Sequence, residues 1–179
     1  LDPNDAMVRF NKASLLQALG KNDEAIEAFE GAIASDPNGT IAIVAWAGKG
    51  VSLYNQEKYD DAIKAYDEAI NLSPNNAHAW WSYKGNALAA LGKYEEAINA
   101  DDEAISLNPD YAEAWNNKGF ALRNLGRYDE AIEAFDEAIR LDPNLSQPWK
   151  NKGAALEALG KTNEANAAFA KGEELGNTG

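Results

Sequence analysis

A proline recurs along this sequence at a nearly constant interval, and that spacing restricts the fold more than any other feature. Five of the six prolines are separated by 34, 37, 35 and 34 residues: Pro3, Pro37, Pro74, Pro109 and Pro143. Each follows Asp, Asn or Ser and precedes Asn or Asp, which is a stop signal for a helix. The spacing therefore predicts tandem copies of one supersecondary unit of about 34 residues.

The interval from Ala112 to Leu145 shows what one unit contains. Its apolar residues are three and four positions apart, which is the period of an α-helix. Gly126 lies in the middle, after one periodic stretch and before the next, where a glycine is typical of a helix C-terminus. Each unit is therefore predicted to be a hairpin of two helices.

Small residues recur inside both predicted helices. The first helix carries Gly50, Gly85, Gly119 and Gly153, and the second carries Ala25, Ala62, Ala97, Ala131 and Ala165. A glycine inside a helix costs about 1 kcal/mol relative to alanine, so we expect a close approach of the paired helix at these positions. An aromatic series in the second helix lies beside them: Phe29, Tyr66, Phe135 and Phe169. One hairpin cannot bury this stripe alone, so neighbouring hairpins must cover it.

The repeated pattern is Trp115, then Gly119, Ala131, Phe135 and Pro143, and it resembles the tetratricopeptide repeat. The resemblance extends over almost the whole chain. It implies an all-α fold, a right-handed α-solenoid of five antiparallel helix-turn-helix units with ten helices. In that fold the first helices line a concave surface and the second helices lie outside. We expect a single array over residues 1–179 with units at about 6–39, 40–76, 77–111, 112–145 and 146–179. Because the sequence begins with "LDPN" rather than Met, we also expect it to be part of a longer protein.

The chain departs from the family pattern at two positions of the first helix. Where the family favours leucine, every unit here has lysine: Lys12, Lys49, Lys84, Lys118 and Lys152. Where the family favours tyrosine, every unit has leucine: Leu16, Leu53, Leu88, Leu122 and Leu156. We expect the lysine stems to pack and the ammonium groups to reach carboxylates of second helices.

Three irregularities carry separate expectations. The segment "GTIAIVAW" holds three extra residues, which predict an added helical turn capped by Thr40; the alternative is that Ile41 and Val44 form an exposed apolar lip. Asp101 replaces the aromatic residue of the other units, so solvent or a cation such as Lys84 should reach it, or the packing there is loose. Polar residues in the last unit, Asn166 and Glu173 among them, are typical of a terminal cap.

Composition excludes several functions. A formal net charge of −13 opposes binding to nucleic acid or to an anionic membrane surface. The chain has no cysteine and one histidine, His78, so we expect no enzyme activity, no metal and no cofactor within it. The absence of cysteine is compatible with a reducing compartment, and we expect a cytoplasmic location.

The inward positions that the resemblance assigns to the first helices define the candidate site. They are rich in asparagine, whose amide both donates and accepts hydrogen bonds, and in aromatic residues. The predicted peptide-binding residues are Asn11, Tyr54, Asn55, Tyr83, Asn86, Asn116, Asn117, Phe120, Arg123, Asn124, Lys150 and Asn151. The alternative is that these asparagines only keep an exposed surface hydrated.

Two patterns within the family bear on the ligand. The clamp of chaperone-tail binders matches at Asn86 and Asn117, but Ser82, Gln147 and Asn151 occupy positions where that clamp needs cations. The positions of Asn11, Asn117 and Asn151 resemble part of the asparagine ladder of O-linked N-acetylglucosamine transferases. We therefore predict a scaffold that binds an extended peptide or a partner helix of another protein. The alternatives are a substrate-recruiting region of a larger enzyme, such as a glycosyltransferase, and a module that associates end to end with itself.

Overall fold

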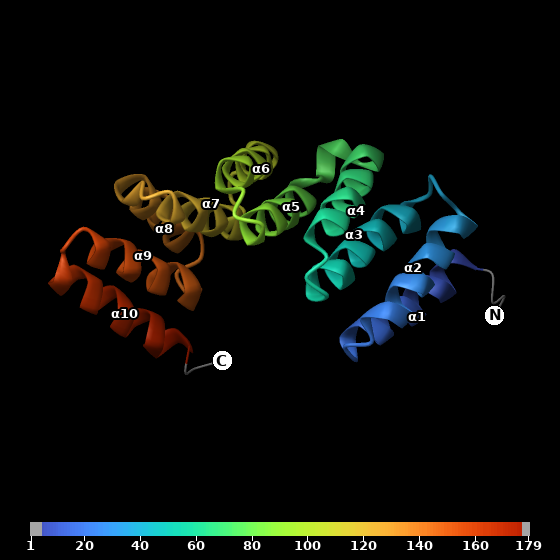
Figure 1. Cartoon of the computed structure of the whole chain (residues 1–179), viewed down its shortest axis with the longest axis horizontal. Coiled ribbons are helices and arrows are strands. Elements are labelled where there is room, and N and C mark those ends of the chain that lie inside the picture. Colours follow the sequence, from blue (N-terminus) through green and yellow to red (C-terminus); the bar gives the residue numbers. More distant parts are fainter. Residues whose placement is uncertain (1–4, 177–179) are drawn as a thin grey trace. The chain divides into compact units, whose positions relative to one another are not determined.

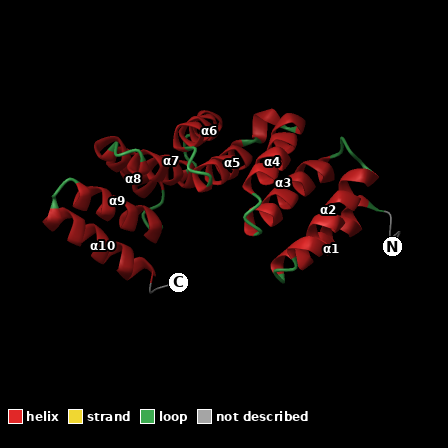
Figure 2. Ribbon diagram, in the orientation of Figure 1, coloured by secondary structure: helices red, strands yellow, loops and turns green. Residues whose placement is uncertain are grey.

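A computed structural model describes residues 5–176, and within that range the secondary structure consists of ten α-helices, one short 3-10 helix and no strand. Figures 1 and 2 show the helices in chain order. Their bounds are α1 Ala6–Ala18, α2 Asn22–Ser35, α3 Thr40–Asn55, α4 Tyr59–Leu72, η1 Pro74–Asn76, α5 His78–Ala90, α6 Tyr94–Leu107, α7 Ala112–Asn124, α8 Tyr128–Leu141, α9 Ser146–Ala158 and α10 Thr162–Gly176. The predicted all-α class and the ten helices are confirmed.

The turn inside each hairpin is a left-handed C-cap. Gly126 has φ 76° and donates its N–H to Arg123 O at 3.0 Å, while the next N–H, that of Arg127, reaches Leu122 O at 3.0 Å. This is the Schellman arrangement, which satisfies the last carbonyl groups of a helix. Glu57 occupies the same position of the α3–α4 turn with φ 60°. The predicted separator glycine is confirmed, and one turn forms without it.

The chain divides into two compact units, residues 1–91 and residues 92–179. In the first unit α2 packs against both α1 and α3, and α4 packs against both α3 and α5. In the second unit α7 packs against both α6 and α8, and α9 packs against both α8 and α10. Each second helix between two first helices thus covers the apolar face that one hairpin would leave exposed. The single array over the whole chain remains a prediction.

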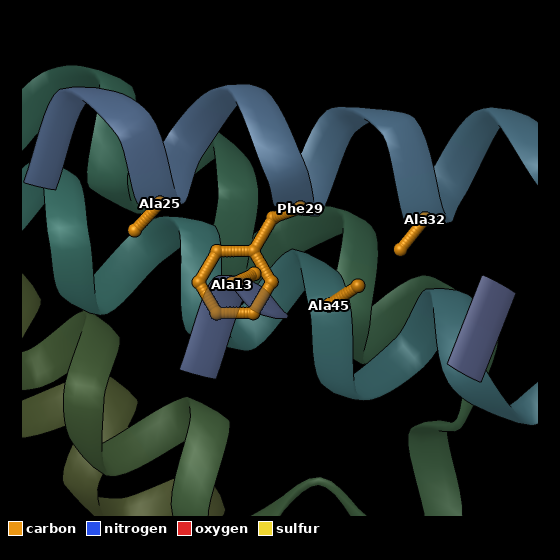
Figure 3. Close-up of a cluster of buried hydrophobic side chains, with 5 residues drawn as sticks. All are labelled: Ala13, Ala25, Phe29, Ala32 and Ala45. Atoms are coloured by element: carbon orange, nitrogen blue, oxygen red, sulfur yellow. The ribbon is translucent and has the colours of Figure 1, made fainter. Parts of the chain in front are cut away.

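Phe29 of α2 is at the centre of the first core cluster. Its ring is surrounded by fully buried alanines of three helices, Ala13 of α1, Ala25 and Ala32 of α2, and Ala45 of α3 (Figure 3). Alanines leave room for the backbones to approach, and the Phe29 ring, with the Phe10 ring 5.9 Å away, fills the space between the three helices.

Three of the four glycines predicted inside the first helices, all but Gly85, face an aromatic ring of the paired second helix. A Cβ atom at Gly50 would lie 2.5 Å from the Tyr66 ring, and one at Gly119 would lie 2.6 Å from the Phe135 ring. At Gly153 the corresponding distance to Phe169 is 2.7 Å. The expected close approach is therefore a contact between the helix backbone and a ring of the paired second helix.

The extra residues in the second repeat lengthen α3. This helix has 16 residues, whereas α1, α5, α7 and α9 have 13 each. The predicted added turn is confirmed, but the predicted cap is wrong: the N-cap residue is Gly39, and Thr40 is the first helical residue. Ile41 packs against the Phe29 cluster, which leaves only Val44 of the proposed apolar lip exposed.

The recurrent lysines join successive hairpins within each unit. Each ammonium group pairs with a carboxylate on the second helix of the preceding hairpin: Lys49 with Glu30, Lys84 with Asp67, Lys118 with Asp102 and Lys152 with Asp136, at 2.5–2.7 Å. Each also lies 4.9–6.0 Å from the ring centre of a tryptophan on its own helix, at Trp46, Trp81, Trp115 and Trp149. We call this arrangement the lysine brace. The expected reach of the lysines to carboxylates is confirmed at these four positions.

Asp101 of α6 is fully buried. The expectation that solvent reaches this side chain is therefore wrong. The ammonium group of Lys84, the cation named in the other expectation, pairs with Asp67 at 2.6 Å.

Candidate functional site

The predicted site residues all lie on first helices, and their exposure differs widely. Asn11, Asn55, Tyr83 and Asn124 are exposed, while Tyr54, Asn86, Asn116, Asn117, Phe120, Arg123 and Lys150 are partly buried. Asn151 is buried, with 6% of its surface exposed. Each of the two compact units carries part of this set.

In the first unit the site residues form a tyrosine pocket, whose volume is about 240 Å³. It is lined by Val51 and Tyr54 of α3, Tyr66 of α4, and Tyr83 and Asn86 of α5. The rings of Tyr66 and Tyr83 are 5.8 Å apart and tilted by 48°, and Tyr54 contacts Tyr59 edge to face at 5.2 Å. Two successive first helices thus contribute to one pocket, with a second-helix ring between them.

The electrostatics of the tyrosine pocket follow from burial of its phenols. Burial raises the pKa of Tyr66 above the ordinary value for tyrosine, and the nearby hydroxyl groups of Tyr83 and Tyr54 raise it further. Burial also raises the pKa of Tyr54, with an added contribution from Tyr59. All of these effects favour the neutral phenol, so the pocket offers uncharged hydroxyl groups and aromatic surface.

In the second unit the site residues form a hydrogen-bonded amide network between α7 and α9. Asn151 Nδ2 donates to Asn116 Oδ1 at 3.0 Å, and Asn151 Oδ1 accepts from Arg123 Nη1 at 3.3 Å and from Gln147 Nε2 at 3.4 Å. Asn116 Nδ2 in turn donates to Asn117 Oδ1 at 3.4 Å. The network ties α7 to α9, two successive first helices.

Arg123 is the cation of this network. Its guanidinium carbon lies 5.0 Å from the ring centre of Phe120, one turn earlier on α7. The contact with the Phe120 ring and the hydrogen bond to Asn151 hold the guanidinium group at two points.

The structure joins some predicted residues and separates others. Tyr54, Tyr83 and Asn86 share the tyrosine pocket, whereas Asn11 and Asn55 do not line it. Asn116, Arg123 and Asn151 share the amide network. Of the positions where a chaperone-tail clamp needs cations, Ser82 and Asn151 are buried as well as uncharged.

Sequence reasoning missed Val51 and Tyr66 as pocket residues. The sequence pattern places Tyr66 in the core aromatic series, and its ring does pack against Gly50. A signal was present, because Tyr66 is the one tyrosine in a series that otherwise has phenylalanine. A hydroxyl group at a core position is typical of a residue whose end reaches a surface or a pocket.

The second helices carry the acidic surface. A pocket of about 490 Å³ between α7 and α8 is bordered by Glu130, Glu133, Asp136 and Glu137 above Trp115. Across residues 5–176 there is no group of three or more His, Cys, Asp or Glu side chains that could hold a metal ion. No helix within the described range is both long enough and apolar enough to span a membrane.

Stacked helical hairpins with recurrent small, aromatic and tryptophan positions define a helical repeat protein. Three family models described as tetratricopeptide repeat match residues 8–38, 43–76 and 83–146. The chain belongs to the tetratricopeptide repeat family, whose members bind proteins or peptides and are generally not enzymes.

Solved structures share this fold over most of the chain. A crystal structure of MamA is 26% identical over 93% of this chain and 95% of that chain, with a TM-score of 0.77. MamA from residue 41 to its end, from Desulfovibrio magneticus RS-1, is 22% identical over 97% and 96%, with a TM-score of 0.81. YrrB, described as a TPR protein with an unusual peptide-binding site, is 24% identical over 97% and 88%, with a TM-score of 0.71.

Proposed function

We propose that this chain is a scaffold that binds an extended peptide segment of another protein along the inward faces of its first helices. The tyrosine pocket of the first unit is the observation that carries this proposal. It would take one apolar or aromatic side chain of the peptide, while asparagines beside it pair with the peptide backbone.

The size of the tyrosine pocket favours a side chain over a metabolite. Small-molecule sites commonly have volumes of roughly 300–1,000 Å³, and the tyrosine pocket has about 240 Å³. Its walls are phenol rings and Val51, which suit an apolar or aromatic group. Tyr83 is 39% exposed and therefore offers part of its ring to a ligand.

Asn86 gives the pocket a means of holding a peptide backbone. It is partly buried and lines the pocket beside Tyr83. Its amide can donate to a peptide carbonyl group and accept from a peptide N–H whatever the peptide side chains are. The pocket would thus select one side chain of the peptide, and Asn86 would hydrogen-bond to the peptide backbone next to that side chain.

The second unit supplies a different surface. Arg123 and Lys150 place positive charge on first helices, whereas Glu130, Glu133 and Glu137 make the neighbouring second helix negative. A segment lying along α7 and α9 would therefore gain from neutral or acidic side chains. The amide network would hold Arg123 in place for that contact.

The test is a peptide-library selection on the wild-type chain, followed by affinity measurements on variants. Tyr83→Ala and Asn86→Ala should each weaken the selected peptides by about tenfold. Asn71→Ala, an exposed asparagine of the second helix α4, is the matched control and should leave the affinity unchanged. Equal affinities for all three variants and the wild type would exclude the tyrosine pocket as the site, and selection of no peptide would exclude the function.

A further inference from the structure

Tyr66 of α4 brings a hydroxyl group to a position where the fold needs only a ring. The equivalent residue, 17 positions after the recurrent lysine, is phenylalanine in three other second helices: Phe29, Phe135 and Phe169. The Tyr66 ring packs against Gly50 of its own hairpin. The Phe135 ring packs against Gly119 in the same way. The packing therefore explains the ring of Tyr66 and leaves its hydroxyl group without a role in the fold.

The Tyr66 hydroxyl group is reached through the tyrosine pocket. Tyr66 is only 2% exposed, and it lines that pocket. Among residues 5–176 no other residue forms a hydrogen bond with its hydroxyl group. Because a buried polar group needs a hydrogen-bond partner, the partner comes from solvent or from a ligand in the pocket. A ligand that displaces solvent must therefore replace this hydrogen bond or lose affinity.

At two other contacts between successive first helices, a side chain of the protein crosses the equivalent space. The crossing residue lies five positions after the recurrent lysine. Gln17 Nε2 of α1 donates to Gly48 O of α3 at 2.8 Å. Arg123 Nη1 of α7 donates to Asn151 Oδ1 of α9 at 3.3 Å. Gly48 and Asn151 each directly precede the recurrent lysine of their helix, so the two contacts have the same register.

The contact between α3 and α5 lacks such a crossing side chain. Tyr54 occupies the crossing position of α3, and Tyr83 directly precedes the recurrent lysine of α5. The Tyr54 ring instead meets Tyr59 edge to face at 5.2 Å, at the start of its own second helix. Within the part of the chain that the structure describes, Tyr54 makes no side-chain hydrogen bond to α5. The space that Gln17 and Arg123 cross elsewhere is here the tyrosine pocket, so a group from another molecule can enter it.

We propose that the tyrosine pocket is specific for a tyrosine side chain of the bound peptide, whose phenol forms a hydrogen bond with the Tyr66 hydroxyl group. This inference rests on the proposed function and names the side chain that the pocket selects. A phenol both donates and accepts hydrogen bonds, so it can pair with a second phenol in either direction. Its ring adds edge-to-face or offset contacts with the rings of Tyr54 and Tyr83.

The lining of the pocket disfavours other side chains. Phenylalanine would displace solvent from Tyr66 without replacing its hydrogen bond. Arginine or lysine would bring a positive charge to a lining that holds no carboxylate, and aspartate or glutamate would bring a negative charge to a lining that holds no cation. Burial raises the pKa of Tyr54 and of Tyr66, so these phenols stay neutral and do not balance a charged ligand.

The test compares peptides that differ by one oxygen atom. A positional-scanning peptide library first identifies the peptide position at which residue type matters most. The tyrosine and phenylalanine versions of that peptide are then titrated by calorimetry into the wild-type chain, Tyr66→Phe and Tyr128→Phe. Tyr66→Phe introduces the residue that three other hairpins have, so it should leave Tm unchanged or raise it. Tyr128→Phe is the matched control, because it removes a hydroxyl group from α8 and does not line the tyrosine pocket.

The wild-type chain should bind the tyrosine peptide about tenfold more tightly than the phenylalanine peptide. Tyr66→Phe should reduce this ratio to about twofold or less. Tyr128→Phe should leave the ratio as it is in the wild type. Equal binding of the two peptides by the wild-type chain, or a preference for tyrosine that persists in Tyr66→Phe, would overturn the proposal.

A second measurement separates this proposal from the proposed function. N-acetyltyrosine amide and N-acetylphenylalanine amide are titrated while the backbone NMR signals of α3 and α5 are followed. Larger shifts with the tyrosine derivative, lost in Tyr66→Phe, would support the specificity of the pocket even if the library yields no peptide. Selection of peptides that show no preference for tyrosine would contradict the specificity and leave the proposed function standing.

Discussion

At the scale of single residues, the five hairpin turns share one backbone conformation, which glycine adopts in four of them and glutamate in the fifth. Gly20, Gly92, Gly126 and Gly160 have φ of 73–76°, and Glu57 has φ 60° in the fifth turn. The hydrogen bonds are the same there, with Glu57 N–H to Tyr54 O at 2.8 Å and Lys58 N–H to Leu53 O at 3.0 Å. The turn therefore forms with glutamate, but the left-handed conformation costs a non-glycine residue about 1–2 kcal/mol.

Glu57→Gly should therefore stabilise the protein. Relief of the backbone strain is partly offset by the greater freedom of glycine in the unfolded chain, which costs about 0.4–1 kcal/mol. The net gain should be about 0.5–1 kcal/mol, or a rise in Tm of about 1–4 °C by circular dichroism. Glu57→Ala removes the same charge without relieving the strain and should bring no such rise. A gain of equal size for both variants would assign the effect to charge.

At the scale of helices, the lysine brace is the recurrent device that fixes one hairpin on the next. Lys118 of α7 joins Asp102 of α6 at 2.6 Å and lies 5.5 Å from the Trp115 ring centre. The lysine side chain is mostly buried, and the carboxylate is about half exposed. A charge held between an acid and an aromatic face loses little further freedom when the pair forms, so this ion pair should contribute more than an exposed one.

A double-mutant cycle on Lys118→Ala and Asp102→Ala should measure a coupling energy of about 0.5–1 kcal/mol in urea unfolding. The matched control is the pair Lys64 and Asp61, which lies within α4 with both side chains well exposed. Its coupling should be clearly weaker than that of the brace, because solvent screens an exposed pair. Similar values for the two pairs would show that the tryptophan and the packing of the lysine stem add nothing to the brace.

At the scale of helices, the sequence predicts the helices and their turns but not which side chains pair between hairpins. Proline spacing, Gly126 and the apolar period predict the helices and their turns, because these signals act within a few residues of the backbone they shape. The partner of each lysine was predicted only as a carboxylate of a second helix. Its identity, for example Asp102 for Lys118, depends on the offset between hairpins, which no local signal contains.

The candidate site was less accessible to prediction for the same reason. Asparagine at a predicted inward position can pair with a ligand or with another asparagine, and residue type does not distinguish the two. Asn151 proves to be buried and bonded to Asn116 and Arg123, while Asn11 is exposed. The tyrosine pocket needs Tyr66 from a second helix, so its composition follows from packing between helices.

At the scale of the whole molecule, the dominant property is charge. The chain has 29 acidic and 16 basic residues, and many of the acids lie on second helices such as α4, α6 and α8. Like charges on one surface repel each other, and this repulsion opposes the compact state. The four lysine braces use four of the bases to neutralise acids at the contacts between hairpins. Other bases pair with exposed acids, as Arg127 does with Glu130 and Arg140 with Glu137, and counterions balance the net excess of acids.

Raising the salt concentration should therefore stabilise the protein. Two effects act in opposite directions, since salt screens repulsion among the acids and also weakens the lysine braces. The braces are short and partly buried, so they are screened less than the exposed acids, and the net result should be an increase in Tm of a few degrees between about 10 mM and 150 mM sodium chloride. A sucrose series at constant ionic strength separates this effect from general exclusion of solutes. If Tm falls with salt instead, the attraction at the braces outweighs the repulsion, and the acidic second helices stabilise the fold through their lysine partners.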